Sequence, residues 1–370
     1  MKNNIFILIL FLFLSCVKKE ETVWLMDFQK PVENPILTPD STFVFHDPIL
    51  QKEVQWQKAD VFNPAAIVRN DSVYLFYRAE DNPGAMLGKR TSRIGLAVST
   101  DGIQFEKFKT PILYPDSGKF MQWDYPGGVE DPRIVELKDS CYVVLYTSWN
   151  YKIARLSAAS SKNLFKWEKH GPVFEKAHDG KFLNTWSKSG SIVTELIDGR
   201  LVAAKIKGKY WMYWGEDFVN LAYSENLIDW IPLLDGKGEL LRVMERRVNR
   251  FDSRLTEPGP PAILTKNGIL LLYNGKNEEG DKADPLIPIG AYCGGQALFD
   301  KKDPAKLIDR LDTPFIKPDL PHEITGQYQA GTTFIEGLVY YKNRWFLYYG
   351  TADSMVGLAI CETKSKRGDD

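Results

Sequence analysis

The sequence predicts an all-β protein built as a five-bladed β-propeller, and two observations carry this prediction. Five segments repeat one pattern, in which a small or polar turn, a short β-branched run, a second polar turn and an aromatic-rich run follow one another. This pattern is typical of two strands joined by a hairpin. Most segments are followed by a further strand, turn and strand, so a unit of four strands recurs about every 60 to 75 residues. A β-sandwich with extra hairpins is the alternative, which the regular spacing disfavours.

The five hairpins can be followed along the chain by their turns. The first starts at Phe62 and turns at Asn-Asp, and the second starts at Glu130 and turns at Lys-Asp. The third starts at Ser187 with an Asp-Gly turn, the fourth at Glu257 with Asn-Gly, and the fifth at Ala330 with Lys-Asn. Since Asn, Asp and Gly tolerate the backbone of tight turns, each pair predicts the tip of a hairpin.

The stretches between the hairpins supply the remaining strands. An apolar run, a turn and a run with Phe or Trp occur in RIGLAVSTDGIQFEKF, ARLSAASSKNLFKWEKH and VNLAYSENLIDWIPL. Looser versions are YCGGQALFDKKDPAKLIDR and VGLAICET. No stretch is a candidate for a long helix.

The first residues precede the fold and are predicted to direct export. Residues 1–16 contain one Lys, an apolar run and Ser15-Cys16, the layout of a signal peptide. Cys16 resembles the acylated cysteine of bacterial lipoproteins, and an ordinary signal peptide is the alternative. We therefore expect a lipid anchor at Cys16, a tether over 17–30 and a propeller domain over 31–370. The expected location is the cell envelope, either periplasmic or on the outer-membrane surface.

The composition argues against several classes of function. The formal net charge is -1, which gives no electrostatic reason to expect nucleic acid as a partner. The chain has four histidines and no CxxC or HExxH motif. A His-rich metal site and a Ser-His-Asp triad are therefore disfavoured, and neither a metal nor a cofactor is expected.

A propeller would bring polar residues from all five repeats to one face, because equivalent turns converge there. The turns before the first strands hold Asp60, Asn63, Glu130, Asp131, Arg133, Lys188, Glu257 and Gln329. The ends of the second strands hold Arg78, Asp81, Trp149, Glu216, Asn274, Lys276 and Asp353. Surface turns also favour Asp and Asn, but acids at corresponding positions of the repeats predict a shared site.

An acidic mouth with basic and aromatic residues suits a neutral polyol such as a sugar. Carboxylates accept hydrogen bonds from neighbouring hydroxyls, and aromatic faces cover the apolar side of the ring. Paired carboxylates also break glycosidic bonds when the pKa of one is raised by its surroundings. Asp131, Glu216 and Glu257 are the candidates for this chemistry.

Seven motifs in order resemble glycoside hydrolase family 130. They are FNPA, LFYRAED, SRIGLAVSTDG, GVEDPRI, YWMYWGED, EPGPPAILTKNGILLLYNG and LYYGTADSMVGLA. The resemblance runs from Ala59 to Glu362 and implies a five-bladed propeller with a mannoside phosphorylase or β-1,2-mannosidase activity. In the phosphorylases the Asp of the EDPR motif, here Asp131, donates its proton through a sugar hydroxyl, and phosphate attacks the sugar.

Departures from the phosphorylase pattern favour water over phosphate as the nucleophile. This chain has TEPGPPA in place of GAGPPP, which adds Glu257, and YNG in place of YHG, which puts Asn274 where His is usual. The third segment, NTWSKSGSIV, lacks the arginine-rich clamp that the phosphorylases use. An added carboxylate repels a phosphate dianion, whereas hydrolysis requires a general base.

The resemblance therefore implies an inverting, exo-acting β-mannosidase that hydrolyses β-1,2-linked mannosides. Asp131 would protonate the leaving group, and Glu216 with Glu257 would hold and deprotonate the water, with the carboxyl groups about 6.5–9.5 Å apart. For Arg93 and Asp353 the alternative role is an ion pair between blades. The candidate sugar-binding residues are Asn63, Arg78, Asp81, Arg93, Asp353, Asp60, Tyr125 and Lys188.

Two other functions stay open from the sequence. A phosphorylase would need phosphate and would release mannose 1-phosphate. A non-catalytic sugar-binding lipoprotein at the cell surface would bind mannosides without turnover, and its binding would be insensitive to Glu257→Ala.

Overall fold

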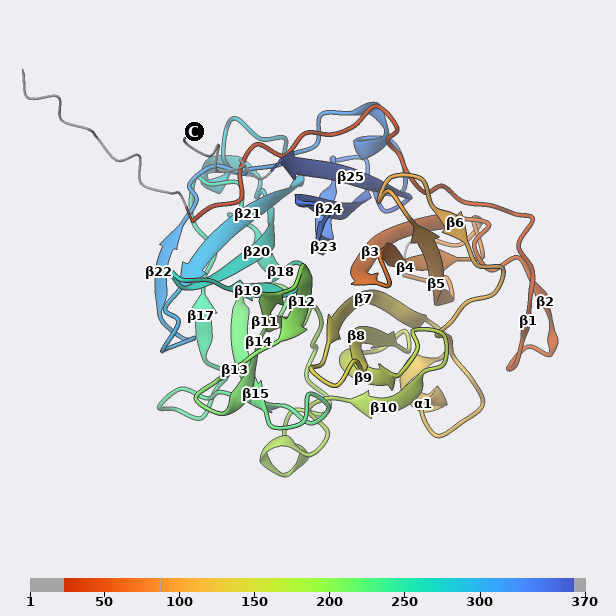
Figure 1. Cartoon of the computed structure of the whole chain (residues 1–370), viewed down its shortest axis with the longest axis horizontal. Coiled ribbons are helices and arrows are strands. Elements are labelled where there is room, and N and C mark those ends of the chain that lie inside the picture. Colours follow the sequence, from red (N-terminus) through yellow and green to blue (C-terminus); the bar gives the residue numbers. More distant parts are fainter. Residues whose placement is uncertain (1–22, 87, 363–370) are drawn as a thin grey trace, which may run out of the picture.

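The computed structural model describes residues 23–86 and 88–362. Regular structure in these ranges is almost entirely β-strand, so the all-β prediction is confirmed. Figure 1 shows the strands as sheets arranged around a common centre. No helix in the described ranges is long and apolar enough to cross a membrane.

The predicted signal peptide, Cys16 and residues 17–22 of the predicted tether lie outside the described residues. The rest of the tether segment, residues 23–30, lies against the sheets. Gln29 forms a bridge with Ile360, and the Leu25 amide donates a hydrogen bond of 2.9 Å to Gln296. This part of the chain is therefore packed onto the fold.

The strands form antiparallel groups that follow one another along the sequence. A small hairpin, β1 (Phe45–Asp47) and β2 (Lys52–Val54), precedes them. The first group is β3 (Asp60–Arg69), β4 (Ser72–Glu80), β5 (Ser92–Ser99) and β6 (Glu106–Lys107). Helix α1 (Met121–Asp124) leads to the second group, β7 (Gly128–Glu136), β8 (Tyr142–Trp149), β9 (Ala154–Ser161) and β10 (Glu168–Pro172).

The third group has the largest number of short strands. After η1 (Ala177–Gly180) it contains β11 (Ser191–Ile197), β12 (Arg200–Ala203), β13 (Lys205–Ile206), β14 (Lys209–Trp214), β15 (Val219–Ser224), β16 (Ile231–Pro232) and β17 (Arg242–Met244).

The last two groups complete the described chain. The fourth contains β18 (Leu255–Pro258), β19 (Ala262–Leu264), β20 (Ile269–Lys276), η2 (Gly280–Lys282), β21 (Tyr292–Phe299) and β22 (Leu307–Arg310). The fifth follows η3 (Pro321–Glu323) and contains β23 (Thr333–Tyr341), β24 (Arg344–Thr351) and β25 (Met355–Glu362).

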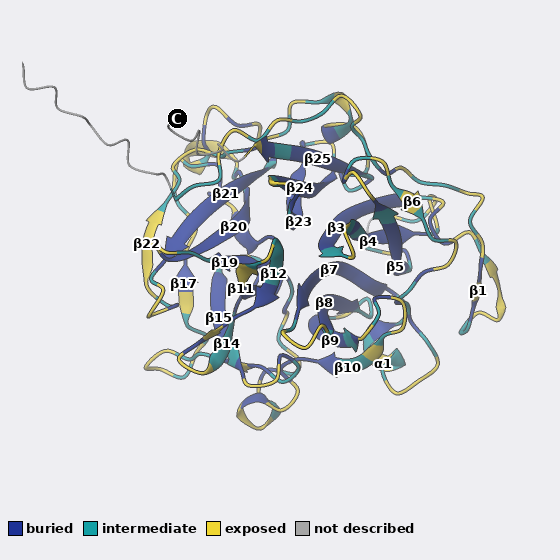
Figure 2. Cartoon of the chain, viewed as in Figure 1, coloured by how far each residue is buried: buried dark blue, intermediate teal, exposed yellow. Residues whose placement is uncertain are grey.

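The inner strands are buried on both faces, and the outer strands are not. All nine residues of β7 are buried, whereas β22 is mostly exposed. Figure 2 shows the same contrast between strands near the centre and strands at the periphery. Five apolar clusters each draw side chains from two successive groups, and the cluster with Tyr77 and Tyr348 joins the fifth group to the first. Each large apolar side chain buried in this way stabilises the fold by about 1.5–3 kcal/mol.

Two β-bulges aim polar side chains toward the centre. The pairing register shifts between Phe62 and Pro64 in β3 and between Glu130 and Arg133 in β7. Asn63 and Asp131 occupy these bulges with positive φ values of 45° and 48°. A bulge bends the strand and redirects a side chain, so the Asn-Pro and Asp-Pro pairs mark where the first two groups contribute to the site.

Candidate active site

The three predicted catalytic residues line one cavity of about 340 Å³. Asp131 lies in β7, Glu216 lies two residues beyond β14, and Glu257 lies in β18. The second, third and fourth strand groups thus each contribute one of these acids. Other polar residues that line the cavity are Asn63, Arg78, Glu130, Lys188 and Asp353.

One cation of the cavity, Arg78, is held tightly by three acids. Its Nη2 lies 2.7 Å from Glu80 and 2.8 Å from Glu130, and its Nη1 lies 3.2 Å from Asp131. Asn63 donates a further hydrogen bond of 2.9 Å to the same Asp131 oxygen. We call Arg78, Glu80, Glu130 and Asp131 the Arg78 cluster.

Glycine at position 350 permits this arrangement. A Cβ atom built on Gly350 would lie 2.1 Å from Oδ1 of Asn63, closer than any real contact. Any larger residue at Gly350 would therefore displace the Asn63 amide from Asp131.

The charges of the Arg78 cluster separate the pKa values of its carboxyl groups. Burial raises the pKa of Glu130 to about 7, against Arg78 and with help from the charge of Asp131. Burial acts in the same direction on Asp131, but Arg78, Lys188 and Arg133 outweigh it and hold the pKa of Asp131 below its usual value. The two carboxyl groups share one guanidinium and titrate as a pair. In the ligand-free protein their shared proton therefore resides on Glu130.

Asp353 is a further carboxyl group in this part of the cavity whose pKa is raised. It lies just after β24 with a positive φ of 51°. Burial raises its pKa to about 6, with Arg78 opposing the rise and Asp131 adding to it. The predicted position of Asp353 at the cavity is matched by this geometry.

The second cation, Lys188, sits at longer distances from three acids. Its Nζ lies 3.6 Å from Asp131, 3.7 Å from Glu216 and 3.7 Å from Glu257. Burial acts to lower the pKa of Lys188, but these carboxylates outweigh it and raise the pKa well above its usual value. We call Lys188, Asp131, Glu216 and Glu257 the Lys188 cluster.

Glu257 is the buried member of the glutamate pair. Its side chain accepts a short hydrogen bond from the Ser189 hydroxyl. Burial raises the pKa of Glu257 to about 7, against Lys188 and with help from Glu216. A carboxylate with a pKa near neutrality is suited to take a proton from water.

Glu216 is the partly exposed member, with 32% of its side chain accessible. The indole N–H of Trp186 donates a hydrogen bond of 2.6 Å to Glu216 Oε2. Trp186 in turn packs edge-on against Trp149, with ring centroids 5.7 Å apart. Both tryptophans line the cavity, which gives it an aromatic wall beside a carboxylate.

Four of the predicted sugar-binding residues, Asp60, Asp81, Arg93 and Tyr125, do not line this cavity. Arg93 is fully buried and pairs with Asp47 at 2.6 Å and with Asp81 at 2.9 Å. Asp60 pairs with Arg90, from a loop that the repeat pattern did not place. Tyr125 caps the C-terminal end of helix α1. For Arg93 and Asp60, an ion partner holds the side chain outside the cavity lining.

Several lining residues were missed by the sequence analysis. Tyr292, Tyr328 and Phe334 line the cavity from the fourth and fifth groups. The predicted mouth residue Gln329 is exposed and absent from the lining. Its neighbour Tyr328 lines the cavity instead. The sequence could not distinguish the two, because no sequence pattern fixes the orientation of a loop residue.

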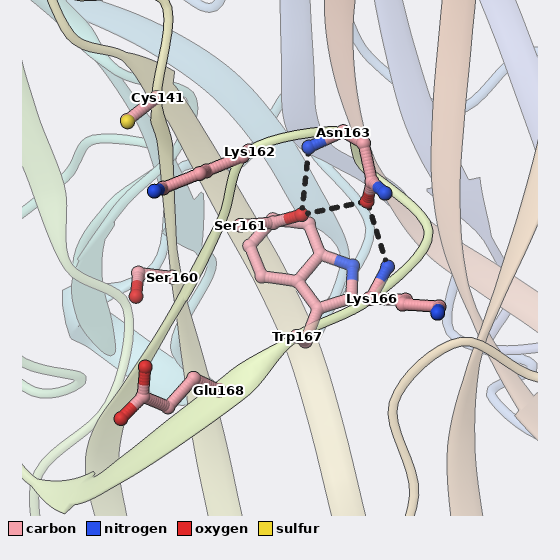
Figure 3. A pocket seen from close by; sticks show the side chains of 8 residues that line it. All are labelled: Cys141, Ser160, Ser161, Lys162, Asn163, Lys166, Trp167 and Glu168. Carbon is pink, nitrogen blue, oxygen red and sulfur yellow. Dashed lines mark hydrogen bonds between the residues drawn. The ribbon is translucent and has the colours of Figure 1, made fainter.

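A larger hollow of about 420 Å³ lies elsewhere, at the turn between β9 and β10 (Figure 3). Its polar groups serve the turn itself, since Asn163 accepts a hydrogen bond of 2.9 Å from the Lys166 amide and Ser161 accepts one of 3.2 Å from the Asn163 amide. It has one acid, Glu168, in its lining. This hollow therefore has no pair of acids among its lining residues.

Comparisons with known proteins show which enzymes this chain is similar to. The profile of glycoside hydrolase family 130, described as "beta-1,4-mannooligosaccharide phosphorylase", matches residues 28–365. The chain is 32% identical over 316 residues to the "1,2-beta-oligomannan phosphorylase" of Thermoanaerobacter sp. (strain X514), and the match covers 84% of this chain and 93% of that protein.

Solved structures are similar over nearly the whole chain. A putative glycosidase from Bacteroides thetaiotaomicron VPI-5482 is 54% identical with a TM-score of 0.90, covering 91% of this chain and 97% of its own. A second structure is 49% identical with a TM-score of 0.91, covering 93% and 96%. It is described as "The GH130 family of mannoside phosphorylases contains glycoside hydrolases that target beta-1,2 mannosidic linkages in Candida mannan".

Proposed function

We propose that this chain, which belongs to glycoside hydrolase family 130, is an inverting, exo-acting β-1,2-mannosidase that uses water rather than phosphate. The observation that carries the choice of water is the balance of charge in the cavity. Its described lining contains five carboxyl groups and two cations, Arg78 and Lys188. Each of these cations already has three acids within 4.0 Å.

This balance disfavours a phosphate nucleophile. A phosphate dianion needs cations that are free to pair with it, and it would be repelled by the carboxylates that surround Lys188. A water molecule between Glu216 and Glu257 meets no such repulsion and finds a base in Glu257. The similarity to a structure described with β-1,2-directed glycoside hydrolases supports the same choice.

The proposed roles follow the two clusters. Glu257 takes the proton of the attacking water, and Glu216 holds the water through its carboxylate. Asp131 passes a proton through a hydroxyl of the bound mannoside to the leaving oxygen. Since the pKa of Asp131 is held low in the free protein, that proton comes from the pair it forms with Glu130, and a sugar that displaces water raises both pKa values.

The distances around Lys188 permit this chemistry. Asp131, Glu216 and Glu257 each have an oxygen within 3.7 Å of one nitrogen atom, so any two of these oxygens lie within twice that distance. This limit admits the short end of the separation of about 6.5–9.5 Å that leaves room for water in inverting enzymes.

We propose that the five strand groups are the blades of a propeller over residues 31–370. The support is the sharing of five apolar clusters by successive groups, with one cluster between the fifth group and the first. Such closure would hold residues from all groups around one centre.

One assay tests the activity. The protein is incubated with β-1,2-mannobiose, with and without inorganic phosphate, and the products are identified. We expect mannose at the same rate in both conditions. Mannose 1-phosphate formed only when phosphate is present would instead establish the phosphorylase activity after which the curated relatives are named.

We further propose that the protein is a lipoprotein of the cell envelope, anchored through Cys16. The support is the sequence of residues 1–16 alone. Metabolic labelling with a radioactive or clickable fatty acid tests this proposal. Label should enter the wild-type protein and be lost in Cys16→Ala, and equal labelling of the two would contradict it.

A further inference from the structure

A buried ion pair, Arg133 with Glu336, lies next to the active-site cavity without lining it. The Arg133 side chain is 1% accessible and that of Glu336 is 0%, and Nη1 of Arg133 lies 3.0 Å from Glu336 Oε1. The sequence analysis placed Arg133 at the mouth and did not single out Glu336. The roles proposed above use neither residue.

The guanidinium of Arg133 contacts the main chain of both catalytic segments. Its Nη1 donates a hydrogen bond of 3.0 Å to the carbonyl oxygen of Asp131 itself. Its Nη2 donates one of 3.2 Å to the carbonyl of Pro258, and its Nε one of 3.4 Å to the carbonyl of Gly259. Pro258 and Gly259 directly follow Glu257, so one rigid group spans from the proposed acid to the proposed base.

Glu336 faces that guanidinium from the fifth strand group, and burial raises the pKa of its carboxyl group well above the usual value, against the charge of Arg133. It lies at the register shift of β23 between Ile335 and Gly337. The Asn274 side chain clamps this point, because it donates a hydrogen bond of 3.0 Å to the Ile335 carbonyl and accepts one of 2.7 Å from the Ile335 amide. Asn274 is the strand partner of Glu257. The strand that carries Glu336 is thereby linked, through Asn274, to the strand that carries the proposed base Glu257.

We propose that Arg133 and Glu336 are positioning residues that set the distance between the carboxyl groups of Asp131 and Glu257. This inference rests on the proposed function in taking those two groups as acid and base. Stability alone does not account for the pair, because a buried ion pair can often be replaced by apolar residues with no loss of stability. Position does account for it, because a displacement of about 1 Å in an active site can cost about 100-fold in rate.

The test is a double variant, Arg133→Met with Glu336→Leu, which replaces both polar side chains and leaves neither partner buried without the other. Its matched control is Lys169→Met with Asp124→Leu, which removes another buried pair, 2.6 Å apart, from outside the cavity. For each variant, the melting temperature, kcat and KM are measured on β-1,2-mannobiose, together with the pH profile of kcat/KM.

We expect both double variants to fold, and only Arg133→Met with Glu336→Leu to lose about 100-fold in kcat, with KM changed by less than about threefold. Because burial raises the pKa of Glu336, the double variant chiefly removes the cation, and since Arg133 lowers the pKa of Asp131 and Glu257, the pH limbs should move upward in that variant. Arg133→Lys separates the two effects, since it keeps the charge but cannot make the same fork of contacts. We expect Arg133→Lys to lose kcat without a shift of the pH limbs.

A folded double variant with wild-type kcat at its own pH optimum would overturn the positioning role. Equal losses in the control would overturn it as well. If the wild type turns over substrate only with phosphate, the proposed hydrolysis fails. The positioning role is then tested by comparing the kcat values of the same variants for phosphorolysis. If the wild type turns over neither way, both the proposed function and this inference fail.

Discussion

The cavity contains two cations that each face three acids, and they differ in how closely the acids approach. The acids of the Arg78 cluster lie 2.7 to 3.2 Å from the guanidinium, within hydrogen-bonding distance. The acids of the Lys188 cluster lie 3.6 to 3.7 Å from the ammonium, beyond it. In the first cluster the guanidinium of Arg78 is hydrogen-bonded to all three carboxyl groups, which holds these side chains in place. The second leaves space in which water and a sugar can enter, and Asp131 belongs to both.

The largest expected effect comes from the Lys188 cluster, in the variant Glu257→Gln. The amide keeps the shape of the side chain but cannot accept the proton of the water, and removal of a general base costs about 10²–10⁴-fold in rate. We expect kcat to fall by about 10³-fold, within that range, with little change in KM, in steady-state assays.

The control for this variant is Glu136→Gln, another buried glutamate, which pairs with Arg200 outside the cavity. Its kcat should stay within about twofold of the wild-type value. A Glu257→Gln protein with more than a tenth of the wild-type kcat would exclude Glu257 as the base.

The contrast between the cations is sharpest in Arg78→Met against Lys188→Met. Loss of Arg78 leaves three buried acids without their hydrogen-bonded partner, and breaking a buried pair in this way costs about 3–5 kcal/mol. We expect urea denaturation to show this loss for Arg78→Met and a clearly smaller one for Lys188→Met, whose long contacts contribute less. Equal losses would mean that the two clusters do not differ in the way their distances indicate.

The pH dependence of activity should report both clusters. Activity requires Glu257 deprotonated, so kcat/KM should rise with pH up to about 7, the value to which burial raises its pKa. It requires a proton on the pair of Glu130 and Asp131, so kcat/KM should fall as pH increases beyond about 7, where Glu130 loses its proton. In Lys188→Met the rising limb should move to higher pH, because the cation that lowers the pKa of Glu257 is gone. A rising limb that stays in place would remove Lys188 from this role.

The smallest effect is expected at the exposed edge of the Lys188 cluster, in Trp186→Phe. This change keeps an aromatic ring but removes the hydrogen bond to Glu216. Since Glu216 is one-third accessible, water replaces part of that bond, and we expect kcat to fall by less than about tenfold. Trp186→Ala also removes the aromatic wall and should raise KM more than Trp186→Phe does. Identical KM values in the two variants would argue against contact between the indole and the sugar.

Much of the fold and the centre of the site follow from the sequence, because a repeat fixes which ends of which strands meet. Asp131, Glu216 and Glu257 share one cavity because the starts of the first strands, which hold Asp131 and Glu257, and the ends of the second strands, one of which precedes Glu216, meet at one face. The bulges at Asn63 and Asp131 each occur at a residue that precedes a proline, although the repeat pattern alone did not predict a bulge there. The remaining errors concern individual side chains. Arg93 has the spacing of a cavity residue, but its side chain forms an ion pair with Asp47 from the hairpin of β1 and β2. That hairpin is not part of any repeat, so the repeat pattern could not predict this contact.

Glu336 is the opposite case, a residue beside the site that the sequence analysis did not name. It lies within an apolar run of the fifth repeat and has the sequence context of a core residue, and the structure does bury it completely. Its partner Arg133 is more than two hundred residues earlier in the chain. A contact of that separation depends on how the fifth group meets the second, which the pattern of turns and strands does not contain.

The most direct measurement of the central claim is proton NMR of the first product formed from β-1,2-mannobiose in phosphate-free buffer. Water held between Glu216 and Glu257, opposite a leaving group protonated from Asp131, must attack with inversion. We predict that α-mannose appears first and only later equilibrates with the β-anomer. Initial release of β-mannose, or no release until phosphate is added, would contradict it.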